Sequence, residues 1–93
     1  EKMSKKRDRL EVIYDILNII QNHKNSIKPT PLLRYSNLSS QSFSDYFKEL
    51  IKKEFIKEIF DKKGKKFITL TDKGFKYLNE YKMIRRFIDD FDL

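Results

Sequence analysis

The first apolar residues of the chain recur at the spacing of an α-helix. The main stripe consists of Leu10, Ile13, Ile16, Leu17 and Ile20. Their intervals of three or four residues predict a buried helix over residues 9–22. This helix is expected to end by Asn25-Ser26, because these residues favour turns and Pro29 disfavours helical geometry in the residue before it.

Two more helices are predicted after this point, with a short turn between them. Thr30 is expected to cap the first, with Pro31 at the first helical position, where its missing N–H costs nothing. Ser39 is expected to cap the second, which runs to about Lys53. Only three or four residues separate the two helices, which is the spacing of a helix-turn-helix.

The helix after Ser39 is predicted to be amphipathic. Its apolar face contains Phe43, Tyr46, Phe47, Leu50 and Ile51. Its other face contains Gln41, Ser44, Asp45, Lys48 and Lys52. Because residues three and four apart share a face, the first set is expected to meet the core and the second to face solvent or a partner.

A β-hairpin is predicted next, since residues 55–60 and 66–70 are rich in aromatic and β-branched side chains around a turn. The alternation is imperfect in both strands, so the pattern leaves open which residues face inward. Thr71 is expected to cap a last helix that continues to Phe91. The predicted fold class is therefore mainly α with a small β-hairpin.

The last helix carries two sets of apolar residues. Phe75 and Leu78 are expected to pack on the core beside the hairpin. The second set steps by four and three residues in the a/d rhythm of a coiled coil and comprises Tyr77, Tyr81, Ile84, Ile88 and Phe91. So small a domain would leave this stripe exposed, and a homodimer joined through the last helix is expected.

Charge indicates what kind of partner such a domain binds. The 93 residues include 21 Lys and Arg against 14 Asp and Glu, for a net charge of +7. This excess points to an anionic partner, with nucleic acid first. Residues 1–66 hold all of the excess, with 16 basic and 9 acidic residues, so partner binding is assigned to that part.

Several other functions are not expected from this composition. There is no cysteine and His23 is the only histidine, so no metal site, cofactor or catalytic pair is expected. The core is too small for a small-molecule pocket to be expected. No apolar run approaches the roughly 18–20 residues that span a bilayer. We expect no membrane partner and a cytoplasmic, nucleoid-associated location.

The order of elements and several local segments resemble a known family. The segments are residues 6–17, 36–39, 50–56 and 70–74, the last reading Leu-Thr-Asp-Lys-Gly. They resemble the small archaeal winged helix-turn-helix DNA-binding proteins of the chromatin-associated and regulator type, which dimerise through a C-terminal antiparallel coiled coil. Glu54 stands where that family usually has glycine, so a differently shaped bend is expected there.

The resemblance implies a winged helix-turn-helix DNA-binding domain with a basic N-terminal arm over residues 1–71 and a coiled-coil dimerisation helix over residues 72–93. It implies a transcriptional regulator or chromatin-associated protein that binds double-stranded DNA as a homodimer through the third helix and the basic wing. The alternative is a winged-helix interaction or assembly module whose wing binds an acidic protein surface. RNA is a third possible partner.

On this interpretation the third helix enters the major groove, and its candidate DNA-binding residues are Ser40, Gln41, Ser44, Lys48 and Lys52. Gln bridges adenine and Ser contacts several bases, so base recognition is expected to be modest. Asp45 counts against tight binding, because phosphates repel it unless it accepts a hydrogen bond from cytosine or pairs with Lys48 or Lys52. The alternative is a solvated helix face with no binding role.

Basic residues elsewhere are the candidates for backbone contacts. Lys62, Lys63, Lys65 and Lys66 flank the glycine at the hairpin tip, where they are expected to reach phosphates or, alternatively, only to keep the loop soluble. The N-terminal candidates Lys5, Lys6 and Arg7 belong either to an arm along the DNA or to a disordered end. Arg34 is expected to touch a phosphate, and Tyr35 beside it is assigned to the core.

Overall fold

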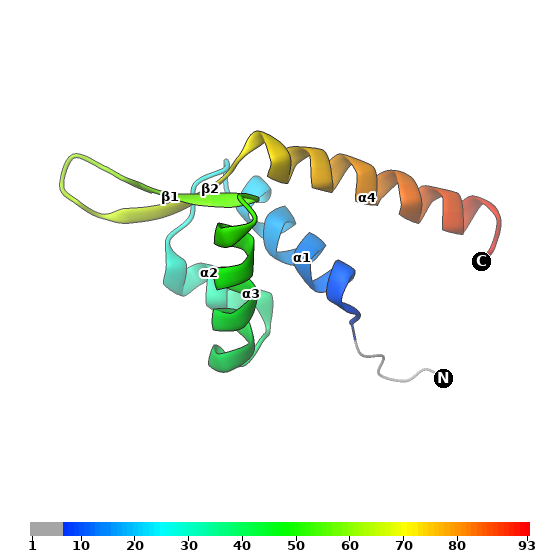
Figure 1. The fold of residues 1–93 in the computed structure, drawn as a ribbon, viewed down its shortest axis with the longest axis horizontal. Helices are drawn as coiled ribbons and strands as arrows, with labels where there is room; N and C mark the ends of the chain where they lie inside the picture. The colour runs from blue at the N-terminus through cyan, green and yellow to red at the C-terminus, as the bar shows by residue number, and fades with distance from the viewer. Residues whose placement is uncertain (1–6) are drawn as a thin grey trace.

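Four helices and one β-hairpin form residues 7–93, the part of the chain that the computed structural model describes (Figure 1). The elements are α1 (Arg9–Asn22), α2 (Pro29–Ser36), α3 (Ser40–Lys52), β1 (Ile56–Phe60), β2 (Lys66–Leu70) and α4 (Asp72–Asp90). This order confirms the predicted fold class. The candidates Lys5 and Lys6 lie outside the described residues.

Side-chain caps determine where three of the helices begin. Asp8, Ser39 and Thr71 precede α1, α3 and α4, and each side chain accepts a hydrogen bond from a backbone N–H three residues further on. These bonds satisfy donors that have no partner within the helix. The predicted caps Ser39 and Thr71 are confirmed.

The predicted start of α2 is wrong. The helix begins at Pro29, and Lys28 precedes it without a side-chain cap. Thr30 therefore lies inside the first turn and caps nothing. Pro29 explains the difference, because its fixed φ already suits the helix and it has no N–H to be satisfied.

One hydrophobic core is shared by all of these elements. Its buried residues are Val12, Ile13, Ile16, Leu17 and Ile20 from α1, together with Ile27, Leu32, Phe43, Leu50, Ile56, Ile68, Leu70 and Leu78. The first helix supplies five of the thirteen and packs against α2, β2 and α4. Burial of each such side chain contributes about 1.5–3 kcal/mol, so α1 is the central element of the fold.

The hairpin has one end on the core and the other beyond it. β1 and β2 are antiparallel, with Ile56 opposite Leu70 and Phe60 opposite Lys66. Ile56, Ile68 and Leu70 are buried, and these residues fix the inward face that the sequence left open. Further out, the hairpin projects past α2 and α3 (Figure 1).

The segment between α1 and α2 forms an isolated β-bridge with this two-stranded sheet. Ile27 donates its backbone N–H to the carbonyl of Ile68 at 3.1 Å and accepts from the Ile68 N–H at 2.7 Å. Asn25 also accepts from the backbone N–H of Leu70 through its side-chain oxygen at 2.8 Å. These bonds place residues 25–28 beside the base of the hairpin.

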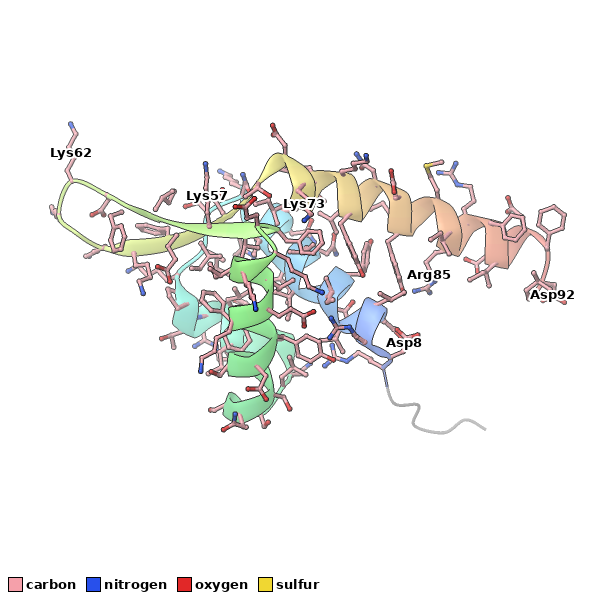
Figure 2. The ribbon with its side chains drawn as sticks, in the orientation of Figure 1. Asp8, Lys57, Lys62, Lys73, Arg85 and Asp92 are labelled. Atoms are coloured by element: carbon pink, nitrogen blue, oxygen red, sulfur yellow. The ribbon has the colours of Figure 1, made fainter. Side chains whose placement is uncertain are left out.

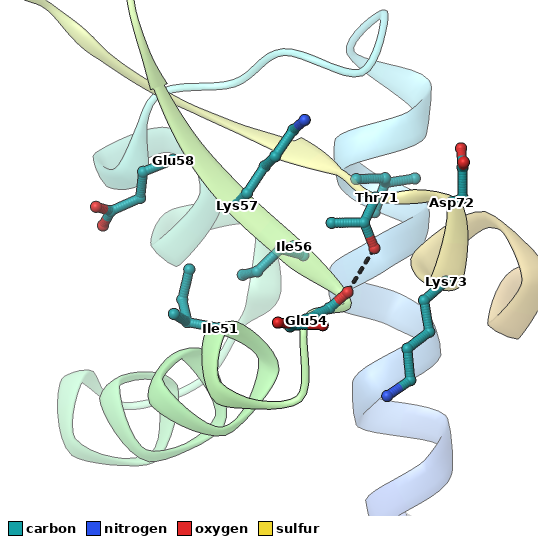
Figure 3. A pocket seen from close by; sticks show the side chains of 9 residues that line it. Ile51, Glu54, Ile56, Lys57, Glu58, Thr71, Asp72 and Lys73 are labelled. Carbon is teal, nitrogen blue, oxygen red and sulfur yellow. Dashed lines mark hydrogen bonds between the residues drawn. The ribbon is translucent and has the colours of Figure 1, made fainter.

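The bend from α3 into β1 is formed by Glu54, whose φ is 63°. This left-handed conformation is the one that glycine adopts without penalty and that other residues adopt at a cost of about 1–2 kcal/mol. The Glu54 carbonyl accepts a hydrogen bond from the hydroxyl of Thr71, which joins the bend to the start of α4 (Figure 3).

Gly74 allows α4 to begin close against the same bend. A Cβ atom built at Gly74 would lie 2.3 Å from the carbonyl oxygen of Phe55, far closer than any real contact. The same oxygen accepts the backbone N–H of Thr71 at 3.1 Å. In the Leu-Thr-Asp-Lys-Gly segment, Thr71 therefore caps α4, and Gly74 lacks a side chain where the backbone of α4 meets that of Phe55.

Only the first half of α4 packs on the domain. Leu78 is buried, while every residue from Lys82 to Leu93 is exposed. The helix extends away from the hairpin, so that the hairpin tip and the C-terminus lie at opposite ends of the molecule (Figure 1).

Candidate functional site

The polar face of α3 is oriented by the burial of its apolar face. Phe43 and Leu50 are buried and Tyr46, Phe47 and Ile51 are partly buried, as the helical spacing predicted. The candidates on the other face are Ser40, Gln41, Lys48 and Lys52, which are exposed, and Ser44, which is half-buried. The core thus holds these five polar side chains on one accessible surface.

Asp45 is paired on this surface with Gln41. The Gln41 amide donates to a carboxylate oxygen of Asp45 at 3.1 Å, one helical turn away. Within residues 7–93 neither Lys48 nor Lys52 forms an ion pair, so the expected pairing of Asp45 with a lysine is not observed. Both ammonium groups remain available to an anion, whereas Gln41 already uses one of its amide N–H groups on Asp45.

At the hairpin tip one side chain shapes the turn, and the lysines beside it remain exposed. Asp61 accepts backbone N–H groups of Lys63 and Lys65 at 2.8 and 2.9 Å, and Gly64 has the positive φ of 82° that the turn requires. The carboxylate is therefore used to shape the loop. Lys62 points away from the domain at the tip (Figure 2), and Lys63 and Lys65 are exposed beside it.

The fourth tip lysine has a partner. Lys66 lies 3.3 Å from a carboxylate oxygen of Glu58 across the hairpin, whereas Lys62, Lys63 and Lys65 form no ion pair within the described residues. An exposed pair of this kind contributes about 0–1 kcal/mol. Lys66 therefore exchanges this partner for another anion at little cost.

Lys28 lies beside the wing lysines Lys65 and Lys66, although it is not among the residues predicted to bind DNA. A shallow pocket of about 370 Å³ is lined by Lys28, Lys65 and Lys66 together with the first turn of α2. The ammonium group of Lys28 also lies 6.0 Å from the centre of the Phe67 ring. The bridge between Ile27 and β2 creates this proximity, and such a long-range pairing leaves no local pattern in the sequence.

Arg34 is exposed near the end of α2, with its guanidinium 5.6 Å from the centre of the Tyr35 ring. Tyr35 is 51% exposed, so its assignment to the core is wrong. Leu32 and Ser36 occupy the buried side of this short helix, which leaves Tyr35 outside, against the ring of His23 at 5.1 Å.

Arg7 does not join the other candidates. Its guanidinium donates to the Asp15 carboxylate at 2.8 Å and to the backbone carbonyl of Ser36 at 3.0 Å. The following arginine, Arg9, pairs with Glu49 of α3. These contacts join Arg7 to α1 and the end of α2, and Arg9 to α3.

The predicted dimer residues fall into two groups. Tyr77 donates its hydroxyl to the carbonyl of Leu10 at 2.8 Å, and the ring of Tyr81 stacks on Tyr14 at 4.7 Å, so both belong to the contact between α4 and α1. Burial is the largest cause that raises the pKa of Tyr77 from 10.0 to about 12, and the neighbouring Tyr81 raises it further.

The other three predicted dimer residues, Ile84, Ile88 and Phe91, contact no core and are exposed. Met83 and Phe87 are exposed on the same half of α4 and were not among the predicted residues. The five side chains form an apolar surface on the part of the helix that extends past the domain.

A pocket of about 720 Å³ lies between the end of α3, β1 and the start of α4 (Figure 3). Its ionisable lining residues are Glu54, Glu58, Asp72, Lys57 and Lys73, so its charges nearly balance and do not favour an anion. Lys73 is already bonded to the carbonyl of Lys53 at 2.8 Å.

Residues 7–93 lack two other kinds of site. No group of three or more His, Cys, Asp or Glu side chains there is placed to hold a metal ion. No helix in that range is long and apolar enough to cross a membrane.

Comparison with known proteins matches the winged helix-turn-helix family model to residues 6–89. The structure of Sso10a-2, a DNA-binding protein from Sulfolobus solfataricus, is similar with a TM-score of 0.71 and 16% identity over 91% of this chain and 85% of that one. F93 from STIV, a winged-helix DNA-binding protein, is similar with a TM-score of 0.72 and 21% identity over 87% and 92%. No curated protein matches the sequence.

Proposed function

Because the chain belongs to the winged helix-turn-helix family, we propose that it binds double-stranded DNA as a homodimer. The observation that carries the proposal is a set of five lysines, two on α3 and three at the hairpin tip, which are exposed and form no ion pair among the described residues. Sso10a-2 and F93, which share the fold, are both described as DNA-binding proteins.

In the proposed complex α3 lies in the major groove, which is wide enough to admit a helix. Lys48 and Lys52 neutralise phosphates at its edges, while Gln41 and Ser44 face the bases. This surface offers few base-specific contacts, because Ser44 is half-buried and Gln41 is bonded to Asp45. Affinity is therefore mainly electrostatic.

The wing contributes the backbone contacts. Lys62, Lys63 and Lys65 of each chain reach phosphates beside the groove, supported by Lys28 and Lys66, and Arg34 contacts the backbone from α2. If the three tip lysines of both chains each neutralise one phosphate, the plot of log affinity against log salt has a slope of about −5 from the wings alone.

The exposed end of α4 is the proposed dimer contact. Ile84, Ile88 and Phe91 of one chain pack on the same residues of another, with Met83 and Phe87 beside them. Burial of this surface removes apolar area that an isolated domain would leave in water. A dimer that binds mainly the phosphate backbone of DNA suits a transcriptional regulator or a chromatin-associated protein.

Fluorescence anisotropy with a short duplex tests this function. The Lys62→Glu, Lys65→Glu double variant is expected to lose most of the affinity of the wild type and to show a shallower salt slope, by about 4 for the four lysines removed per dimer. The control is Lys76→Glu, Lys82→Glu, which places the same charge change on α4 and likewise lowers the net charge from +7 to +3. The control is expected to retain much more of the affinity.

Equal losses in the two double variants would show that net charge, not the wing, attracts DNA. Absence of wild-type binding at low salt would refute duplex binding altogether. The same titration with single-stranded RNA and with an acidic protein would then test the other partners.

A further inference from the structure

The hairpin carries an exposed aromatic side chain next to its lysines. Phe60 is the last residue of β1 and is 61% exposed. A single exposed apolar residue is common on protein surfaces and needs no explanation by itself. The position and orientation of this ring distinguish it from such cases.

The register determines which way Phe60 faces. Alternate residues of a strand share a face, so Phe60 lies on the same face of the hairpin as Ile56. Ile56 is buried in the core, as are Ile68 and Leu70 of the partner strand on this face. Phe60 therefore faces the side on which the helices lie, at a point where the hairpin has already passed beyond them (Figure 1).

Lysines are the neighbours of Phe60 toward the hairpin tip, and Glu58, the carboxylate on the same face, is paired with Lys66. Lys66 is directly opposite Phe60 in the register, and the turn with Lys62, Lys63 and Lys65 follows immediately. A hydrophobic ring gains little binding free energy beside phosphates, whereas a lysine gains much. The combination fits a partner that has anionic edges and an apolar stack between them, which describes a groove of duplex DNA.

We propose that Phe60 enters the minor groove and wedges partly between two base pairs. The inference rests on the proposed function: with α3 in the major groove, a hairpin that projects past α3 reaches the neighbouring minor groove. That groove is about 6 Å wide, which admits side chains but not the hairpin itself. Apolar wedges of this kind unstack one step and bend the duplex.

The wedge supplies a source of sequence preference that α3 lacks. Pyrimidine–purine steps unstack most easily, so the proposed contact favours a duplex that has such a step, for example TA, under the wing. Recognition then depends on how readily the DNA deforms, and not only on hydrogen bonds to bases.

The matched pair Phe60→Ala and Ile59→Ala tests the proposal. Ile59 is the adjacent residue, is 39% exposed and faces the opposite side of the hairpin. Affinity is measured by anisotropy, and bending by energy transfer between dyes at the two ends of a duplex with a central TA step. Phe60→Ala is expected to bind about tenfold more weakly and to lose the bend, with the salt slope unchanged.

Ile59→Ala is expected to match the wild type, and Phe60→Leu to keep part of the bend because it remains an apolar wedge. Wild-type affinity and bending in Phe60→Ala would overturn the inference and leave the proposed function intact. A change of Phe60→Ala from dimer to monomer in sedimentation would also overturn it, because the ring would then belong to a contact between two chains. Absence of wild-type binding would remove both proposals.

Discussion

Replacement of Glu54 by glycine is expected to stabilise the fold. Glu54 has a φ of 63°, and a side chain in the left-handed region costs about 1–2 kcal/mol relative to glycine. Glycine offsets about 0.5–1 kcal/mol of this stabilisation, because it loses more conformational entropy on folding than other residues. The net increase in the free energy of unfolding is therefore about 0.5–1 kcal/mol.

The backbone hydrogen bonds of the bend remain in the glycine variant. The Glu54 carbonyl still accepts from Thr71, and its N–H still donates to the carbonyl of Ile51 at 3.0 Å. For a domain of this length the gain corresponds to a rise in Tm of about 4 °C. Thermal unfolding followed by circular dichroism measures it, at one fixed protein concentration because a dimer unfolds in a concentration-dependent way.

Two controls separate backbone strain from other effects. Glu54→Gln keeps the side chain and removes the charge, so its Tm is expected to equal that of the wild type. Asn37→Gly replaces another left-handed residue, with φ of 59°, but asparagine tolerates this region and the gain is expected to be smaller. A Glu54→Gly variant less stable than Glu54→Gln would refute the strain argument.

Two predictions concern α4. The Ile84→Asp, Ile88→Asp variant is expected to be a folded monomer in sedimentation, because these side chains are 54% and 36% exposed in the single chain. A dimer mass in this variant would contradict the coiled-coil contact. For Tyr77, the folded pKa of about 12 exceeds the ordinary value of 10.0, so the folded state holds its proton longer than the unfolded state. Stability is therefore expected to fall between about pH 10 and pH 12 in urea titrations, and to fall less in Tyr77→Phe.

Much of the fold is encoded locally and could be predicted from the sequence. The caps Ser39 and Thr71 act on N–H groups three residues away, so their partners are visible in the sequence itself. The two faces of α3 follow from spacing alone. The start of α2 is harder to predict, because Pro29 and Pro31 both lie in its first turn and the first of them already suits a helix.

The arrangement of the candidate site depends on contacts between distant residues. Arg7 was grouped with an arm, but its partners Asp15 and Ser36 come together only when α1 packs on α2. The orientation of Phe60 became clear only from the strand register, since apolar residues occur on both faces of β1. Tyr77 and Tyr81 fit the coiled-coil rhythm equally well, and packing on α1 alone distinguishes them from Ile84.

The bond between Gln41 and Asp45 bears on how quickly the protein would release incorrect sites. A carboxylate in the middle of the proposed DNA-facing surface weakens attraction to every phosphate backbone, whatever the sequence. The penalty is partly recovered only where Asp45 meets the amino group of a cytosine and Gln41 is freed for an adenine. In the proposed complex, residence on random DNA would be shortened more than residence on such a site, and a faster search would accompany a lower affinity.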